Sequence, residues 1–276
     1  MRSAFALIRV SFLTAASYRF AMFVSVASLA LQIVPTYFIG RTLDPFMAPA
    51  IEGQGSDYFG FLVVGTIAYL LLAASVDALP RAVERGISTG TLELIFSTPS
   101  STPSLLVGLT GYELLWTAIR CLVVLGAAAV FGFHAHWSRL PEAVAILALV
   151  VATYFGLGMV AGAMIIAFRR TAAVQTVVIV GSAMFGGVTY PPSLVTTAVS
   201  RYSDAPAWIG RLTEVIPLTY GLRAVRQITI DDAPLRAVLA DVGMLAVFCF
   251  VFLSVGSLAM MYALRRARAE GTLSQY

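Results

Sequence analysis

The chain has 276 residues, of which 59% are hydrophobic and 12% are charged. Soluble domains are usually about 45–50% apolar and about 25% charged, so the composition excludes an ordinary soluble domain and predicts an all-α integral membrane protein. The formal net charge is +4, and a basic balance in a membrane chain reports its orientation, not nucleic-acid binding.

The first 19 residues combine apolar positions with arginines. Phe5, Ile8 and Phe12 fall on one face of a helix, and Arg2 and Arg9 on another. This pattern predicts a helix that lies in the membrane interface before the first span, and the alternative is a frayed end of that span. The apolar run that follows is too long for the core of a signal peptide and is expected to be retained.

Six apolar runs are long enough to cross a bilayer core, which takes about 20 residues of helix. No internal repeat of fixed period is found, so the chain is predicted to be one transmembrane domain of residues 1–276. The six predicted spans are residues 20–40, 58–79, 105–133, 142–168, 172–190 and 237–264.

The arginines predict the orientation of these spans. If the N-terminus is cytoplasmic, the short outer loops hold only Arg41 and Arg139. This positive-inside bias predicts that both termini are cytoplasmic, together with residues 81–104 after the second span. The arginines then inside are Arg2, Arg9, Arg19, Arg81, Arg85, Arg169, Arg170, Arg265, Arg266 and Arg268.

The last outer segment, residues 191–236, is rich in apolar residues but too interrupted to span. Pro206 and Pro217 would break any long helix. We expect short re-entrant or interfacial helices here, because non-helical backbone at membrane depth must be buried in protein or line a cavity.

Three polar or small-residue patterns each leave two interpretations open. His134 and His136 are solvated loop residues or part of a metal or pH site, although no third ligand is evident. Glu113 and Arg120, two turns apart within one span, are structural or belong to a transport path. The GxxxG of residues 158–162 indicates close helix packing within the chain or a dimer seam.

Several chemistries lack the residues that they need. All eighteen basic residues are arginines, whereas a P-loop places a lysine on the nucleotide phosphates. No G-x-S-x-G elbow accompanies the two histidines, which disfavours a hydrolase or an intramembrane lipid-modifying enzyme. An ATP-independent transporter or channel would show repeats or a charged midplane site, and neither is seen. Cys121 and Cys249 lie in apolar runs and indicate no disulfide framework.

Two segments carry a resemblance to a known family. They are "TGTLELIFSTPSSTPSLLVGL" (89–109), after the second span, and "MFGGVTYPPSLV" (184–195), followed by "APAWIGRLTEVIPLTYGLRAVRQI" (205–228). Together with the six spans, they resemble the permease subunits of type-2 ABC exporters, the ABC-2 permeases. The matching positions are Gly90, Thr91, Leu92, Glu93, Thr98, Pro99, Pro191, Pro217, Leu218, Thr219, Tyr220 and Arg226.

The resemblance implies half of an ATP-driven exporter in the bacterial cytoplasmic membrane. Two permeases, identical or related, would join two separate subunits that bind ATP and Mg, so this chain would hold no cofactor. Membrane lipids are the other expected partners, and nucleic acid is not. The cargo would be amphiphilic: a lipid, a glycan or a drug-like compound.

The resemblance also implies three sets of site residues. In residues 86–100, a short coupling helix, capped at its start by Thr89 or Thr91, would dock on the ATP-binding subunit. The contact residues would be Gly90, Thr91, Leu92, Glu93, Ile95, Phe96, Thr98 and Pro99. Tyr190, Pro191, Pro217 and Tyr220 would form an outer gate, with interfacial anchoring as the alternative role of the tyrosines. Tyr37, Phe38, Tyr69, Met184 and Phe185 would line the translocation path, unless they only pack.

Overall fold

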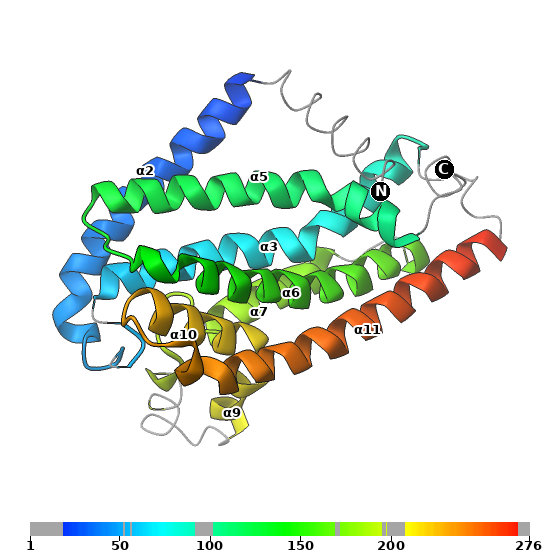
Figure 1. The fold of residues 1–276 in the computed structure, drawn as a ribbon. Coiled ribbons are helices and arrows are strands. Elements are labelled where there is room, and N and C mark those ends of the chain that lie inside the picture. The colour runs from blue at the N-terminus through cyan, green and yellow to red at the C-terminus, as the bar shows by residue number, and fades with distance from the viewer. Residues whose placement is uncertain are drawn as a thin grey trace.

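The described part of the chain is a bundle of long helices with shorter helices gathered at one end (Figure 1). The computed structural model describes residues 19–51, 53–55, 57–91, 102–168, 172–194, 197 and 208–269. Within these ranges every regular element is helical, as the composition predicts. The elements are α2 (Arg19–Met47), α3 (Tyr58–Ser88), α5 (Thr102–Val130), η1 (Trp137–Arg139), α6 (Leu140–Phe168), α7 (Ala172–Phe185), α9 (Trp208–Val215), α10 (Pro217–Thr229), η2 (Leu235–Val238) and α11 (Leu239–Ala269).

Five of the described helices are long and apolar enough to cross a membrane, compared with the six spans predicted. The predicted span over residues 172–190 is represented by α7, which has 14 residues. At 1.5 Å per residue, α7 is about 21 Å long, shorter than the roughly 30 Å of a bilayer core. The turn of Gly186 and Gly187, where Gly187 has a φ of 86°, ends α7 before the predicted boundary. The count of six is therefore not confirmed by the described helices.

The helix α3 is the central element of the bundle. It packs against α2, α5, α6, α7 and α10, and buried residues lie along its whole length. Its start is capped by Asp57, whose carboxylate accepts a hydrogen bond from the Gly60 amide at 3.1 Å. The sequence predicted an end near residue 79, but the helix continues through Pro80 to Ser88. Pro80 is tolerated because it lies in a packed helix, where neighbouring helices support the interrupted ladder.

The two glycines of the GxxxG pattern pack within the chain. A Cβ atom on Gly158 would lie 2.6 Å from the Ser75 carbonyl oxygen of α3. A Cβ atom on Gly162 would lie 3.1 Å from the Met260 side chain of α11. Small residues at these positions let α6 approach α3 and α11 closely. Of the two interpretations, packing within the chain is the one observed.

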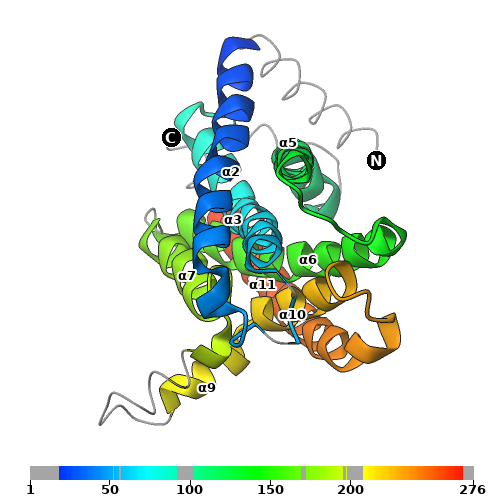
Figure 2. The ribbon, with the colours of Figure 1, turned by 90° about the vertical axis from the view of Figure 1, so that its left-hand side faces the viewer.

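The short helices α9 and α10 occupy the segment where short helices were predicted. Pro217 is the first residue of α10 and separates it from α9, as expected of a proline. The apolar face of α10 is inserted into the end of the bundle, where it packs against α3, α6, α7 and α11 (Figures 1 and 2). Its most deeply buried residues are Leu218, Leu222, Ala224, Val225, Arg226 and Ile228.

Candidate functional site

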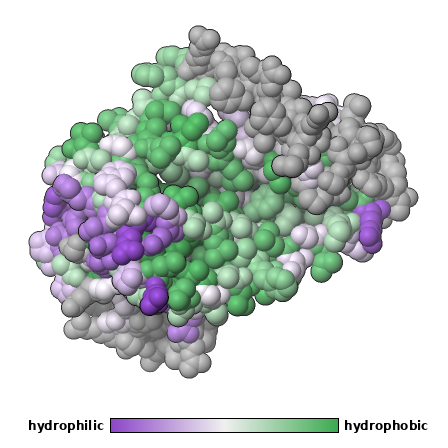
Figure 3. Space-filling model, in the orientation of Figure 1, coloured by the Kyte–Doolittle hydropathy of each residue, from purple (hydrophilic) through white to green (hydrophobic). Residues whose placement is uncertain are grey.

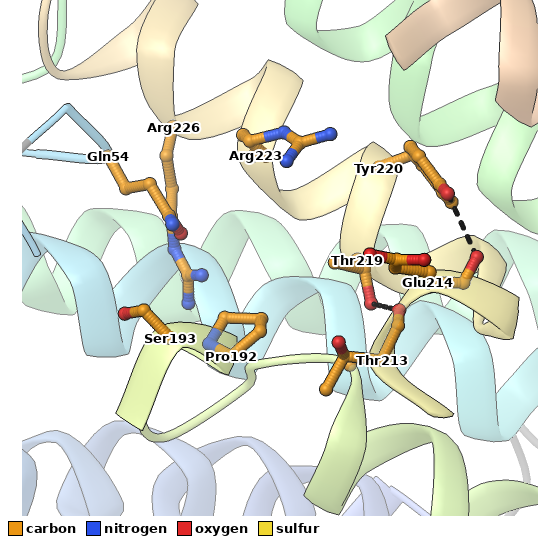
Figure 4. A pocket seen from close by; sticks show the side chains of 10 residues that line it. Gln54, Pro192, Ser193, Thr213, Glu214, Thr219, Tyr220, Arg223 and Arg226 are labelled. Atoms are coloured by element: carbon orange, nitrogen blue, oxygen red, sulfur yellow. Dashed lines mark hydrogen bonds between the residues drawn. The ribbon is translucent and has the colours of Figure 1, made fainter. Parts of the chain in front are cut away.

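A cavity of about 350 Å³ lies where α10 meets the loops at that end of the bundle (Figure 4). Its wall comes from three separate parts of the chain: the loop between α2 and α3, the turn after α7, and the α9–α10 pair. The lining residues are Gln54, Gly186, Pro192, Ser193, Thr213, Glu214, Thr219, Tyr220, Arg223 and Arg226.

Arg226 is the most deeply buried charged residue in the described part of the chain, at 1% exposure. Its Nη2 donates hydrogen bonds to the carbonyl oxygens of Phe61, at 3.0 Å, and Val188, at 3.2 Å. Its guanidinium lies 3.3 Å from the centre of the Phe61 ring. The side chain thus joins α10 to the start of α3 and to the turn after α7, a role that requires its planar, multi-donor head.

The charge of Arg226 has no carboxylate partner among the described residues. Its Nε is buried and has no hydrogen-bond partner there. Burial lowers the pKa of Arg226 well below its ordinary value, because removal from water disfavours the charged form. By contrast, the neighbouring Arg223 is ion-paired with Asp241 of α11, and this hydrogen bond raises the pKa of Arg223.

A backbone approach holds the turn after α7 against α3. Gly65 of α3 faces the Val188 carbonyl so closely that a Cβ atom could not be placed there. The hydroxyl of Tyr58, at the start of α3, donates to the Thr189 carbonyl at 2.8 Å. The glycine and these two hydrogen-bonded side chains, Tyr58 and Arg226, therefore position one wall of the cavity.

The four predicted gate residues lie on two elements around this cavity. Tyr190 and Pro191 are on the turn after α7, whereas Pro217 and Tyr220 are on α10. Only Tyr220 lines the cavity, and its hydroxyl donates to the Glu214 carbonyl at 2.8 Å. The Arg223 guanidinium lies 5.5 Å from the centre of the Tyr220 ring. Tyr220 is therefore held in place by α9 and α10, and the gate role stays a prediction.

The five predicted path residues do not gather at one place. Tyr37 packs its ring against Phe59, at 5.3 Å, and Phe131, at 5.2 Å, as a core aromatic does. Phe38 and Met184 are 62% and 51% exposed, and Tyr69 and Phe185 are partly exposed. None of the five lines the cavity at α10. Their role in a path stays a prediction, and for Tyr37 the observed contacts are those of packing.

The beginning of the predicted coupling segment closes α3. Gly90 has a φ of 65°, and the Thr91 amide donates to the Gly86 carbonyl at 3.0 Å, which is the Schellman pattern of a helix end. The Thr89 hydroxyl donates to the Arg85 carbonyl of the same helix at 2.7 Å, so Thr89 takes part in the end of α3. Six predicted contact residues lie outside the described residues: Leu92, Glu93, Ile95, Phe96, Thr98 and Pro99.

Glu113 and Arg120 each bind a different helix. The Glu113 carboxylate lies 3.8 Å from Arg81 of α3. Nη2 of Arg120 donates to the hydroxyl of Ser25 in α2 at 3.1 Å, and its guanidinium lies 5.9 Å from the ring of Trp116. These contacts favour the structural interpretation, in which each residue joins α5 to a neighbouring helix.

We expect Arg120→Met to weaken the packing of α2 on α5 by about 1.5–3 kcal/mol, because one charge-assisted hydrogen bond is lost. The thermal midpoint of the purified protein should fall, whereas ATPase activity per folded complex should stay unchanged. Ser25→Ala removes the acceptor of the same hydrogen bond and should lower the midpoint by a similar or smaller amount. Normal stability with lost activity would instead assign Arg120 to the transport path.

The two histidines bind backbone carbonyls. Nδ1 of His134 lies 2.8 Å from the Gly132 carbonyl oxygen, and Nδ1 of His136 lies 3.3 Å from that of Thr229. Within the described ranges, no group of three or more His, Cys, Asp or Glu residues could hold a metal ion. The metal interpretation therefore gains no support.

Sequence reasoning found Arg226 only as a motif match and missed Gln54, Arg223 and Asp241. The available signal was that Arg223 and Arg226 lie three positions apart in the apolar-rich segment of residues 191–236. Residues three apart share one helix face, so both could have been assigned to one side of α10.

Comparison with known proteins agrees with this architecture. The family model described as "ABC-2 type transporter" matches residues 3–230. Nodulation protein J of Rhizobium leguminosarum bv. viciae is similar, with 23% identity over 202 residues that cover 72% of each chain. The family match spans most of the chain, including α2 to α10. The chain therefore belongs to the ABC-2 type transporter family and is a transmembrane transport subunit that is not itself an ATPase.

Proposed function

We propose that this chain is the permease subunit of an ATP-driven exporter. The family match over residues 3–230 carries the proposal. Two copies, or one copy and a relative, would assemble with two ATP-binding subunits that hold ATP and Mg. The cargo would be an amphiphilic lipid, glycan or drug-like compound, moved out of the cytoplasm or the inner leaflet.

The distribution of charge supports a cytoplasmic location for both termini. Arg81 and Arg85 lie near the end of α3, and Arg265 and Arg266 near the end of α11, on the side of the bundle opposite α10 (Figure 1). A hydrophobic surface separates this side from a hydrophilic one near α10 (Figure 3). The arginine-rich side would be cytoplasmic by the positive-inside rule, and the cavity at α10 would then face outward.

The helix α3 supplies a direct mechanical connection between the two sides. Its 31 residues correspond to about 46 Å of continuous helix, more than the roughly 30 Å of a bilayer core. One end leads into the coupling segment, and the other end carries Tyr58 and Phe61, which contact the turn after α7 and Arg226. Closure of the ATP-binding subunits on residues 86–100 would therefore move the wall of the outer cavity.

The test is affinity purification of the tagged chain from its native membranes. Co-purification of an ATP-binding subunit, with ATP-dependent transport after reconstitution, is the expected result. A chain that purifies without an ATP-binding subunit but conducts solutes alone would favour a channel or an ion-coupled transporter and contradict the proposal.

We expect Glu93→Arg to lower ATPase activity of the assembled complex about tenfold, because a charge reversal in the docking segment opposes association. Membrane insertion should be unaffected, since the segment lies between spans. Glu270→Arg is the matched control: it makes the same charge change on the same inferred side, outside the docking segment. Equal activity of the two variants would remove Glu93 from the contact.

A further inference from the structure

The cavity at α10 has a buried, unsatisfied hydrogen-bond donor at one end. Nε of Arg226 is buried without a partner, and the Arg226 charge has no ion pair among the described residues. The partly exposed side chain of Gln54 also lines the cavity, and its amide makes no hydrogen bond to the described residues. Figure 4 shows Arg226 and Gln54 together on one side of the cavity, each from a different element.

A buried, unpaired guanidinium is costly, because its desolvation is not offset by an opposite charge. The two carbonyls on Nη2 offset part of this cost, but the buried Nε has no acceptor among the described residues. The groups that match an arginine fork are phosphate and carboxylate, which accept several parallel hydrogen bonds. The cavity, at about 350 Å³, has room for such a group.

The other charges of the cavity wall favour binding of an anion at the end that holds Arg226. Arg223 is already neutralised by Asp241, with which it forms a two-point ion pair. Glu214, the one carboxylate among the lining residues, lies across the cavity beside Tyr220 and forms no ion pair with either arginine (Figure 4). An anion beside Arg226 would therefore meet one uncompensated positive charge nearby and one negative charge farther away.

We propose that this cavity binds a phosphate group, carried by a lipid headgroup or by a soluble ligand, with Arg226 and Gln54 as its donors. The cavity lies at the end of the bundle opposite the C-terminal end of α3 (Figure 1). Phosphate binding can be measured on this chain without its partner subunits. The binding experiment can therefore fail or succeed independently of the exporter function proposed above.

The test is binding to the purified full-length chain in neutral detergent, with inorganic phosphate and with glycerol phosphate as soluble probes. Nanodiscs of phosphatidylglycerol, compared with nanodiscs of an uncharged glycolipid, provide the lipid probe, read out by the shift in thermal midpoint. Saturable binding of the soluble probes indicates a soluble ligand. A midpoint shift in phosphatidylglycerol alone indicates a lipid headgroup.

Three variants of the cavity and one control variant outside it make the test specific. Gln54→Leu and Arg226→Gln should each weaken binding about tenfold or more, because each removes a donor to the anion. Glu214→Gln should leave binding unchanged or strengthen it up to about threefold, since it removes a like charge from the cavity wall. Arg236→Gln, at an exposed arginine outside the cavity, is the charge control and should bind as the wild type does.

Arg226 also holds the fold together, so Gln54→Leu carries the decision if Arg226→Gln does not yield folded protein. The proposal is overturned if neither probe binds the wild type. It is also overturned if Gln54→Leu binds phosphate as tightly as the wild type, or if Arg236→Gln weakens binding as much as the cavity variants do.

Discussion

Gly158→Ala is expected to destabilise the protein, because the added methyl group would meet the backbone of α3. The new Cβ atom would lie 2.6 Å from the Ser75 carbonyl oxygen and 2.9 Å from that of Val76, both on α3. Backbone atoms cannot rotate away as a side chain can, so the two helices must separate. Overpacking of this kind costs about 1–3 kcal/mol. Gly156→Ala should act similarly against α11, where the Cβ atom would lie 2.5 Å from the Phe252 carbonyl carbon.

The measurement is the thermal midpoint of detergent-purified protein, followed by the loss of the monodisperse peak in size-exclusion chromatography. Gly243→Ala is the matched control, because nothing lies within 4 Å of a Cβ atom at that position of α11. It should be neutral or raise the midpoint slightly, since alanine favours helix by about 0.5–1 kcal/mol. Equal midpoints for Gly158→Ala and Gly243→Ala would contradict the packing of α6 against α3.

Arg226→Leu is expected to reduce the free energy of unfolding by about 2–4 kcal/mol, because hydrogen bonds from a charged donor contribute about 1.5–3 kcal/mol each. The Val188 carbonyl would lose the side-chain donor that holds the turn after α7, and Phe61 would lose the cation above its ring. Relief from burying an unpaired charge opposes this loss. We expect the lost contacts to outweigh that relief, because one side chain joins three separate elements.

The thermal midpoint again measures the effect, with Arg236→Leu as the control for removing an exposed arginine of the same end of the bundle. Arg226→Lys should recover part of the stability, because an ammonium keeps the charge but not the planar contact with the Phe61 ring. If Arg226→Leu proved as stable as the control, the prediction that Arg226 stabilises the fold would be wrong, and ligand binding would be its remaining role.

Much of the architecture was predictable from residue patterns. Long apolar runs locate α2, α3, α5, α6 and α11, because a chain in lipid must satisfy its backbone within each segment. The boundaries were less predictable. A proline disfavours a helix in isolation, yet α3 continues through Pro80 because its neighbours support it. The predicted end at residue 79 therefore missed the last turns of the helix.

Some residues of the cavity at α10 were also predictable from the sequence, whereas others were not. The motif that includes Pro217, Tyr220 and Arg226 located the helix α10, and Pro217 does start it. No local pattern shows that Gln54 and Arg226 line the same cavity, because the two residues are far apart in the sequence and only the fold brings them together. Likewise, the sequence places Glu113 and Arg120 two turns apart in one span but does not show that each binds a different neighbouring helix.

The sequence by itself determined that this chain is a helical membrane protein and that it contains no lysine for a P-loop. These properties follow from composition and order, which act residue by residue through transfer into lipid. Only the tertiary structure decided that Arg226 is buried without a carboxylate partner among the described residues and that Gln54 shares its cavity. Such contacts depend on how close the helices can approach, and in this bundle that distance is set by glycines at the α3, α6 and α11 crossings.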